Sequence, residues 1–472
     1  MPKSVIVRIG LILLAILVIV AIAFGLLIWR FMPKIPTADF PTPQNQVEAR
    51  EQDLEYLLNL TSVDYSFSEE AEREFHAHVE EMRKDIAAMS DIEFALGVAA
   101  AVALADNGHT NVRITPLVEE LNSLPLRFFW FDDGLYVVRA HAEFSDLLGA
   151  QVVAYDGINP DELVPQIARY SGGKEVDARF YSPRFFSSPA IMYGAGLVTN
   201  PDQVSLTLRL INGEEKEAIV QIEEKQTESI PMAKSPLARH FDEEINSGND
   251  WLFLDAESVT KTHYGMHPEK DFWTDRLPNN GYHVRMRWNA STNETSLPRW
   301  LAGISSELQE APADYVVIDL RSNPGGDFTQ VLRFARSVTE LVKPDGRIYT
   351  LTDHGTFSAA IVTTALIKDG AGEQGKIVGS EVGDREQFWA EGGGQPMTLP
   401  NSGIQILAST GYHDWENGCT DWANCFWPNI LIGAAVGKLD PDIIAPVTFS
   451  DYSQGIDTTL QAVFEAEENY AR

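Results

Sequence analysis

The stretch Asp319-Leu320-Arg321-Ser322-Asn323-Pro324-Gly325-Gly326 decides the fold of this 472-residue chain. It continues an apolar run that begins at Tyr315, and a helix is predicted after it, around residues 329–341. A buried strand that ends in paired glycines can bring backbone N–H groups close to an anion, such as a phosphate or a developing oxyanion. The lysine of a P-loop and the third glycine of a dinucleotide-binding turn are both missing, so nucleotide binding is not expected. An ordinary glycine-rich turn between strand and helix is the alternative.

Strands and helices alternate around this stretch, from about residue 245 to the C-terminus. Such alternation predicts an α/β fold in which helices cover a mixed sheet. Residues 45–105 have helical patterning, and residues 125–225 contain short β-like runs separated by turn dipeptides, which predicts a small, mostly β module with one or two helices. The predicted parts are residues 1–35, a cytoplasmic tip and membrane anchor; 36–124, a tether and helical domain; 125–228, the β module; and 229–472, the α/β core.

A second motif, Thr352–Ala360, follows a predicted strand and opens an apolar helix. This places Ser358 at the N-terminus of that helix, where free N–H groups and the positive end of the helix dipole stabilise a developing negative charge. Ser358 is therefore a candidate nucleophile. A serine at this position is also a common helix cap, which is the structural alternative.

Three further side chains are candidates to assist Ser358. His109 lies on a turn directly after Gly108, a residue type that commonly closes a helix in the left-handed conformation. His354, four residues before Ser358, is a competing candidate base. Glu416 follows the last predicted strand of the sheet, where a carboxylate could orient an imidazole. Each of them also has an ordinary interpretation as a packed or solvated side chain.

Cys419 and Cys425 are the only cysteines in the chain. His413 is the only nearby histidine, so a four-ligand zinc site is not supported, and no metal or cofactor is predicted. A local disulfide is favoured because the N-terminus predicts export to an oxidising compartment. Two free buried thiols are the alternative.

The N-terminal run Ile9–Trp29 contains 21 residues without a charge. At about 1.5 Å rise per residue, a helix of that length crosses the hydrocarbon core of a bilayer. We expect an uncleaved membrane anchor, with everything after Pro33 exported, as in a bacterial periplasm. A cleaved signal peptide, with Ala21-Ile22-Ala23 as its small-x-small site, is the alternative.

Acidic residues outnumber basic residues by 68 to 36, which gives a formal net charge of −32. Such a surface repels the phosphate backbone, so a nucleic acid partner is not expected. The acidic excess is spread along the chain and indicates a solvated surface more than a binding patch. The sequence does not predict the oligomeric state.

Taken in this order, the motifs resemble the C-terminal-processing, or tail-specific, serine peptidases and their tricorn-protease-like relatives. Residues 319–326 match the family's Asp-Leu-Arg-x-Asn-x-Gly-Gly turn in every fixed position, and Ser358-Ala359-Ala360 resembles its nucleophile at a helix start. Lys-Ile-Val-Gly-Ser-Glu from Lys376 and the C-terminal Gly455-Ile456-Asp457 resemble later motifs of the family. The resemblance covers about residues 250–465. It implies a ClpP/crotonase-like peptidase core and a protein or peptide substrate.

The two branches of that family differ in their base. The tail-specific branch uses a lysine after the serine, but the corresponding window, residues 382–385, has none, and Arg385 does not deprotonate. The tricorn-like branch takes a histidine from an N-terminal segment, which Asp106–Thr110 resembles. That branch adds a glutamate, and Glu416 falls in the matching place. The chain departs from the tricorn protease in having Gly108 before the histidine and Ala359 after the nucleophile.

The resemblance therefore implies a complete serine-peptidase site without a cofactor. The implied roles are Ser358 as nucleophile, His109 as general base, Glu416 as orienting acid, and the N–H groups of Gly325 or Gly326 and of Ala359 as the oxyanion hole.

The predicted function is a membrane-anchored serine endopeptidase or C-terminal-processing peptidase that acts on exported proteins or peptides. The β module stands where tail-specific relatives carry a PDZ domain, and a PDZ-like module would capture an extended peptide at its sheet edge. One alternative is a non-catalytic anchored peptide-binding protein that kept the fold, which Gly108 and Ala359 favour. Another is a serine hydrolase of a non-peptide ester or amide.

Overall fold

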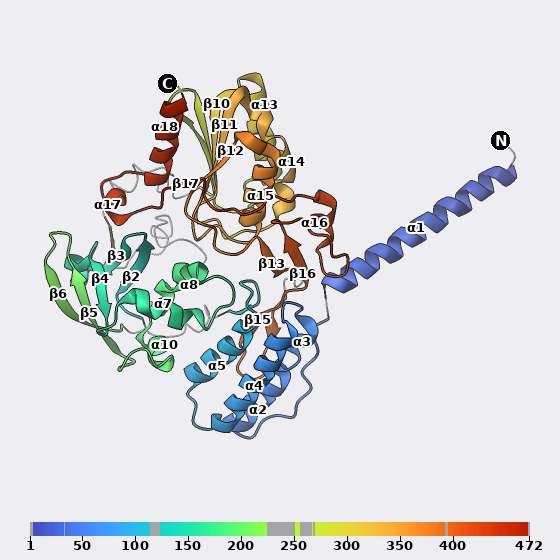
Figure 1. Cartoon of the computed structure of the whole chain (residues 1–472). Helices are drawn as coiled ribbons and strands as arrows, with labels where there is room; N and C mark the ends of the chain where they lie inside the picture. Colours follow the sequence, from blue (N-terminus) through green and yellow to red (C-terminus); the bar gives the residue numbers. More distant parts are fainter. Residues whose placement is uncertain are drawn as a thin grey trace.

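The computed structural model describes residues 3–32, 34–113, 123–223, 251–254, 267, 270–391 and 395–470. Helix α1 (Lys3–Phe31) projects from a body made of a helical part, a β module and an α/β core (Figure 1). The predicted boundary between residues 228 and 229 lies outside the described residues.

The core is one six-stranded sheet with the strand order β17-β12-β11-β10-β9-β8. Neighbouring strands are parallel except for β8 and β9, which pair antiparallel. The predicted mixed sheet is therefore confirmed. The strands are β8 (Phe272–Leu277), β9 (Gly281–Met286), β10 (Ala313–Asp319), β11 (Val342–Thr352), β12 (Gly375–Gly379) and β17 (Ile443–Ile444).

Helices cover both faces of this sheet, because β10 carries apolar side chains on both of its faces. Val316 and Ile318 pack with α13 (Leu297–Glu310) and α15 (Ala359–Ala371), whereas Val317 packs on the other face with α18 (Thr458–Tyr470). Successive side chains of a strand point to opposite faces, which gives β10 two apolar surfaces to bury.

The prediction of a helix over residues 329–341 is wrong about its continuity. The segment is divided into three short helices, η2 (Phe328–Gln330), α14 (Leu332–Arg336) and η3 (Val338–Leu341). The Ser337 hydroxyl donates to the carbonyls of Arg333 and Phe334 at 3.2 and 3.3 Å. A serine that bonds the preceding turn in this way offers the backbone an alternative to a continuous helix.

A buried ion cluster fixes the carboxyl end of β10. The Asp319 carboxylate accepts hydrogen bonds from Arg285 and Arg321, and Arg321 also donates to Asp457 at 2.7 and 3.0 Å. Asp319 and Arg321 are fully buried. The two arginines hold the pKa of Asp319 well below its usual range against the opposing effect of burial. The cluster ties the strand end to the start of α18 at Asp457.

The helical part confirms the predicted helical patterning. Ser68 and Ser90 cap α4 and α5 with their hydroxyls, and the Ser90 cap is reciprocated by Glu93. The helices are α2 (Gln46–Leu57), α3 (Leu60–Val63), α4 (Glu69–Asp85) and α5 (Asp91–Ala103).

A late segment of the chain is built into this helical part. Strand β15 (Gln405–Leu407) pairs with both β14 (Met397–Thr398) and β1 (Asn111–Val112), which directly follows the His109 turn. Met397 and Ile406 are fully buried in the core formed by α2 to α5. Figure 1 shows this segment beside the blue N-terminal helices.

The β module is built on an antiparallel sheet in the order β2-β3-β4-β5-β6, with β7 (Trp251–Phe253) also paired to β3, so its predicted β character is confirmed. The prediction of one or two helices is wrong, since four short ones follow β4. The elements are β2 (Leu126–Phe131), β3 (Gly134–His141), β4 (Gln151–Tyr155), α7 (Pro160–Ala168), α8 (Glu175–Tyr181), α9 (Pro183–Phe186), α10 (Pro189–Gly194), β5 (Gln203–Arg209) and β6 (Glu215–Gln221).

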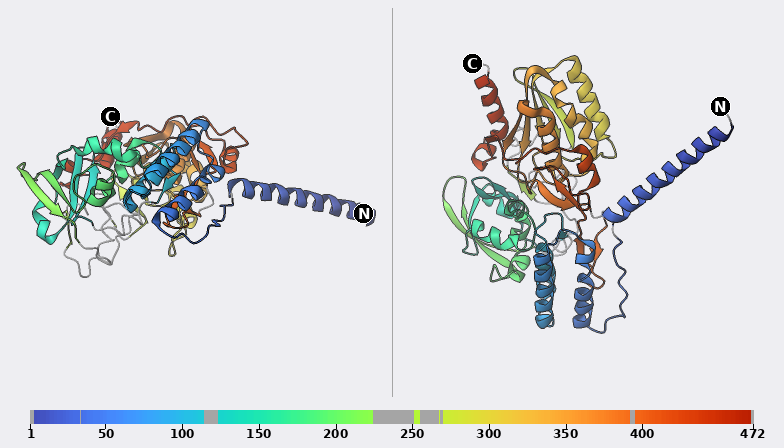
Figure 2. Two further views of the ribbon diagram at one scale, coloured as in Figure 1. Left: turned by 90° about the horizontal axis from the view of Figure 1, so that it is seen from below. Right: turned by 45° about the vertical axis from the view of Figure 1, so that its right-hand side comes forward.

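Helix α1 stands away from the body in every view (Figure 2). Many of its apolar side chains are exposed, including Leu17 and Ile19. Within the described part of the chain, no helix meets both the length and the hydropathy needed to cross a membrane. The predicted span over residues 9–29 is therefore not supported, and the side chains of residues 9, 10, 23, 24 and 27–29 lie outside the described ones.

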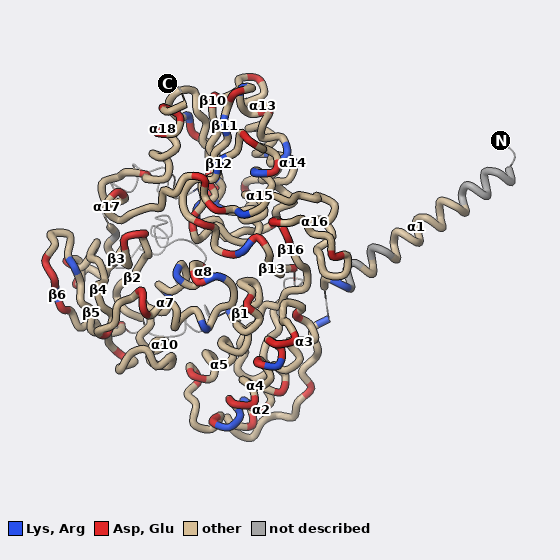
Figure 3. The backbone as a smooth tube through the Cα atoms, in the orientation of Figure 1, with Lys and Arg blue, Asp and Glu red and all other residues tan. Residues whose placement is uncertain are grey.

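Charged residues of both signs are distributed along the backbone of the whole body (Figure 3). Acidic residues occur on all three parts, which agrees with the spread of the acidic excess along the sequence.

Candidate active site

Ser358 lies directly before α15, as predicted, and its backbone is unusual. Its φ and ψ are 55° and −123°, in a region that a residue with a side chain adopts rarely. The hydroxyl caps no helix N–H and makes no hydrogen bond with any described residue. The helix-cap interpretation of Ser358 therefore loses its support, and the strain indicates that the turn serves another purpose.

Short hydrogen bonds from two loops hold this strained turn. The Asp353 carboxylate accepts from the N–H of Ser322 at 2.6 Å and from the N–H of Gly355 at 2.9 Å. The N–H of Phe357 donates to the carbonyl of Asn323 at 2.9 Å. The turn at residues 319–326 and the Ser358 turn are thereby locked together, which explains why both motifs occur in one chain.

Glycines make room for this close approach. A Cβ on Gly325 would lie 2.6 Å from the Cβ of Ser358, and its φ of 108° disfavours any side chain. The N–H of Gly325 is already engaged, because it donates to Oδ1 of Asn323 at 3.0 Å. The N–H groups of Gly326 and Ala359 donate to no described acceptor. Of the predicted oxyanion donors, Gly326 and Ala359 are thus the ones available.

Replacing Gly325 by alanine should damage the site severely. The added methyl group must displace Ser358 or the N–H of Ala359, and misplacement of a nucleophile by about 1 Å costs about 100-fold in rate. We expect Gly325→Ala to lower kcat/KM for a peptide substrate by at least that factor.

Gly303→Ala is the matched control, because a Cβ there meets nothing within 4 Å. It lies within helix α13, where alanine is favoured over glycine by about 1 kcal/mol. Activity should stay at the parental level and thermal stability should not fall. Equal losses in both variants would contradict the proposed role of Gly325.

His109 lies against the nucleophile turn, in a column of stacked rings. Its imidazole packs on Phe357, with ring centroids 4.6 Å apart, and on Phe388, with centroids 4.9 Å apart. On the far side, Phe388 stacks on His413 at 4.9 Å. The structure therefore brings His109 from the N-terminal part to the residue next to Ser358.

Neither ring nitrogen of His109 is exposed, and neither has a hydrogen-bond partner among the described residues. Burial, with a smaller effect from nearby His413, lowers the pKa of His109 to about 3. The imidazole is therefore neutral at physiological pH, as a general base must be. The predicted hydrogen bonds from His109 to Ser358 and to Glu416 are not formed in this arrangement.

The His109 turn is anchored to several elements. The Asn107 amide accepts from the N–H of Trp389 at 3.0 Å and donates to the hydroxyls of Thr110 and Ser409. Thr110 in turn donates to the buried carboxylate of Asp64 at 2.7 Å. Strand β13 (Gln387–Ala390) and the segment after β15 therefore fix the position of the turn.

Gly108 has a packing reason in this chain. A Cβ there would lie 2.8 Å from Oδ2 of Asp384 and 3.1 Å from the Phe357 ring. A side chain at this place would collide with both. The position of Asp384 therefore explains why this chain has glycine at position 108.

Asp384 and Asp177 are two buried acids beside this turn. Burial raises the pKa of Asp384 to about 6, and burial together with Asp384 raises the pKa of Asp177 well above its usual range. Each carboxylate has one buried oxygen without a hydrogen-bond partner among the described residues. Both acids were missed in the sequence, where single aspartates in a loop and on α8 give no signal.

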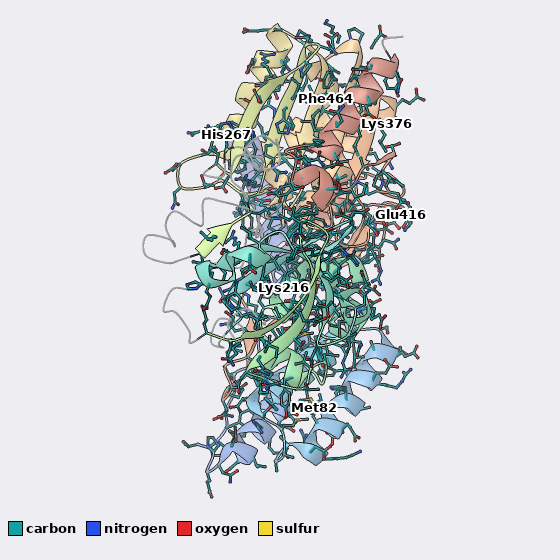
Figure 4. The ribbon with its side chains drawn as sticks, turned by 90° about the vertical axis from the view of Figure 1, so that its left-hand side faces the viewer. Met82, Lys216, His267, Lys376, Glu416 and Phe464 are labelled. Carbon is teal, nitrogen blue, oxygen red and sulfur yellow. A yellow bond between two sulfur atoms is a disulfide. The ribbon has the colours of Figure 1, made fainter. Side chains whose placement is uncertain are left out.

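Glu416 follows β16 (Gly411–Asp414), but β16 pairs with β13 in a two-stranded sheet and is not part of the core sheet that the prediction had it follow. The Glu416 carboxylate is paired with Lys438 at 3.0 Å. Figure 4 shows Glu416 on the same side of the molecule as Lys376, at a height between the α/β sheet and helix α4, which carries Met82. Cys419 and Cys425 form the predicted disulfide in the loop that follows.

His354, the competing base, makes no hydrogen bond with a described residue through its ring. Burial lowers its pKa, opposed by the nearby acids Asp353 and Glu381. It belongs to the same turn as Ser358, and the carbonyl of His354 lies against Gly383. None of the ring stacking that fixes His109 involves His354.

Among the described residues, one group of side chains is close enough to share a metal ion: His141, Glu143 and Glu223 on the β module. Nδ1 of His141 lies 3.6 Å from Glu223 and 3.9 Å from Glu143, and the Glu143 side chain is 62% exposed. These distances are those of a loose ion pair, and none of the three residues belongs to the Ser358 turn.

Comparison with known proteins supports the fold. No protein-family model matches the chain, and no curated protein matches it by sequence. Among solved structures, mature CPAF complexed with lactacystin has a TM-score of 0.55 at 12% identity, covering 90% of this chain and 98% of that one. The tricorn protease (TM-score 0.37, 14% identity, 89% and 36% covered) and the photosystem II D1 C-terminal processing protease (0.36, 12%, 88% and 96%) are more distant. The chain thus has, over nearly its whole length, the fold of CPAF.

Proposed function

We propose that this protein is a serine peptidase with Ser358 as its nucleophile and His109 as its general base. The observation that carries the proposal is the strained, uncapped Ser358, which lies against Gly325 and directly follows Phe357, the ring on which the neutral His109 imidazole stacks. The fold shared with CPAF, and the resemblance of residues 319–326 to the peptidase motif, support the same assignment.

In the proposed reaction the Oγ of Ser358 attacks a peptide carbonyl and gives its proton to His109. The N–H groups of Gly326 and Ala359 stabilise the oxyanion, each contributing about 2.7–4 kcal/mol to lowering the barrier. His109 then protonates the leaving amine as the C–N bond breaks, and water hydrolyses the ester that remains on Ser358. The reaction requires the imidazole to leave its stacked position between Phe357 and Phe388 and to turn toward Ser358.

Substrate capture by the β module is part of the proposal. Within the described residues, β6 pairs only with β5 and leaves one edge of the sheet open. An extended peptide can add to such an edge through backbone hydrogen bonds.

An extracytoplasmic location is also proposed, and the Cys419–Cys425 disulfide supports it, since such bonds persist in oxidising compartments. The exposed apolar side chains of α1 support attachment to lipid. Extraction of the full chain from membranes by detergent, but not by alkaline carbonate, is the expected result.

The experiment that tests the peptidase function uses the purified full-length chain in detergent. We expect it to cleave an unfolded protein substrate and to react with a fluorophosphonate probe, which labels activated serines. Absence of both reactions would contradict the proposal.

The second candidate is a non-catalytic peptide-binding protein on the same fold. The unpaired, stacked imidazole of His109 favours it, because a base that never leaves the ring column cannot activate Ser358. This candidate predicts peptide binding without cleavage and without fluorophosphonate labelling.

A further inference from the structure

We propose that Asp384, and not Glu416, is the carboxylate that positions the His109 imidazole during catalysis. The inference rests on the proposed function and adds a positioning residue to it. Asp384 does not touch the substrate in this proposal. It accepts a hydrogen bond from the imidazole N–H and stabilises the imidazolium that forms when Ser358 gives up its proton.

Glu416 is committed elsewhere. Its Oε2 pairs with Lys438, whose ammonium also lies 3.4 Å from the buried Glu386 carboxylate. The carbonyl of Glu416 accepts from the N–H of Gly437 at 3.0 Å, which fixes the backbone of the loop as well. Use of Glu416 at His109 would break the ion pair with Lys438.

His109 has a clear need for an acceptor. Both ring nitrogens are shielded from solvent and lack a partner among the described residues. A buried donor left without a partner costs stability, because its hydrogen bond to water is lost and not replaced. A carboxylate within the same buried region would remove that cost and fix the tautomer that leaves the other nitrogen free to accept the proton of Ser358.

Asp384 meets this need from a nearby position. Only 2% of the residue is exposed, and its Oδ2 has no hydrogen-bond partner among the described residues. A Cβ added to Gly108, the residue before His109, would lie 2.8 Å from this oxygen and 3.1 Å from the Phe357 ring on which His109 stacks. Pairing Oδ2 with the imidazole satisfies two buried polar atoms at once.

The backbone around Asp384 is tied to both catalytic turns. The N–H of Gly383 donates to the carbonyl of Thr356 at 2.9 Å, in the nucleophile turn. Arg385 donates to the carbonyl and to the carboxylate of Asp106, each at 3.1 Å, in the His109 turn. Asp384 therefore sits on a short segment that joins the two turns, with Oδ1 held by the N–H of Arg385 at 2.8 Å.

The charged groups around Asp384 leave its second oxygen unpaired. Arg385 and Lys174 lower its pKa, Asp106 raises it, and burial dominates, so that the pKa is about 6. Asp177 faces it from α8, and burial together with the charge of Asp384 raises the pKa of Asp177 well above its usual range. Above about pH 6 Asp384 therefore holds a buried negative charge near an imidazole that becomes positive during the reaction.

Isosteric Asn variants of the full chain test the proposal. Asp384→Asn should lower kcat by about 100-fold or more with KM little changed, as expected when an imidazole loses its orienting carboxylate. The parental kcat/KM should rise through about pH 6 as Asp384 ionises, and Asp384→Asn should lose that rise. Asp177→Asn, which replaces the other buried acid, should keep both the rate and the rise, and so should Glu416→Gln.

A second measurement does not depend on the Asp384 variant folding. The fluorophosphonate labelling rate of the parent and of Glu416→Gln should rise with the same midpoint, near pH 6. No rise near pH 6, or a rate loss in Glu416→Gln that Asp384→Asn does not share, would overturn the role of Asp384. Failure of the proposed function itself has a different signature, namely full activity of Ser358→Ala and His109→Ala.

Discussion

Ser358→Ala should abolish both peptide cleavage and fluorophosphonate labelling, with a loss of about 10⁴-fold or more in kcat. The expectation follows from the geometry of the turn. The Ser358 hydroxyl caps no helix and bonds no described residue, so its removal takes away no structural contact. Loss of the nucleophile leaves only the oxyanion donors, which cannot by themselves form the ester intermediate.

Ser380→Ala is the matched control, because Ser380 lies at the end of β12 and contributes its carbonyl, not its hydroxyl, to a hydrogen bond with Thr352. It should retain parental activity and labelling. Thermal unfolding of both variants should occur within about 2 °C of the parent, since neither removes a buried contact. Cleavage by Ser358→Ala at the parental rate would exclude Ser358 as the nucleophile.

Asp319→Ala should produce the largest loss of stability among single substitutions in the core. Asp319 is fully buried and accepts from both Arg285 and Arg321. Removing one partner of a buried ion pair leaves uncompensated charge and costs about 3–5 kcal/mol. Denaturant unfolding of the purified protein measures this change in free energy.

Asp314→Ala is the control on the same strand. Its carboxylate pairs with Lys343 at 2.8 Å, but the two side chains are 42% and 53% exposed. An exposed pair of this kind contributes about 0–1 kcal/mol. Equal losses of unfolding free energy in the two variants would contradict the conclusion that the buried Asp319 cluster stabilises the end of β10.

The parts of the fold with local patterns were predictable from the sequence. A continuous apolar run predicted β10, and the serine caps Ser68 and Ser90 predicted the starts of α4 and α5. The position of Ser358 at a helix start could be predicted for the same reason, because a strand, a turn and an apolar helix follow one another directly in the chain. The roles of Ser358, His109 and Glu416 remain predictions.

The surroundings of His109 could not be predicted, because they depend on long-range pairing. His413 meets Phe388 only through the antiparallel register of β13 and β16, in which the two residues are direct partners. Phe388 then stacks on a ring that comes from the N-terminal part. Asp384 was unpredictable for a similar reason, since its contact with Gly108 joins segments that no sequence period relates.

The pairing of β1 with β15 has a consequence for biosynthesis. The strand that follows the His109 turn finds its partner at residues 405–407, so this small sheet forms only after most of the chain has emerged from the ribosome. Long-range pairing of this kind is slow, because the entropy cost of closing a large loop comes before any stabilising contact forms. The newly made polypeptide therefore cannot assemble its base beside its nucleophile early, and a truncated translation product that stops before residue 397 lacks the scaffold for that turn.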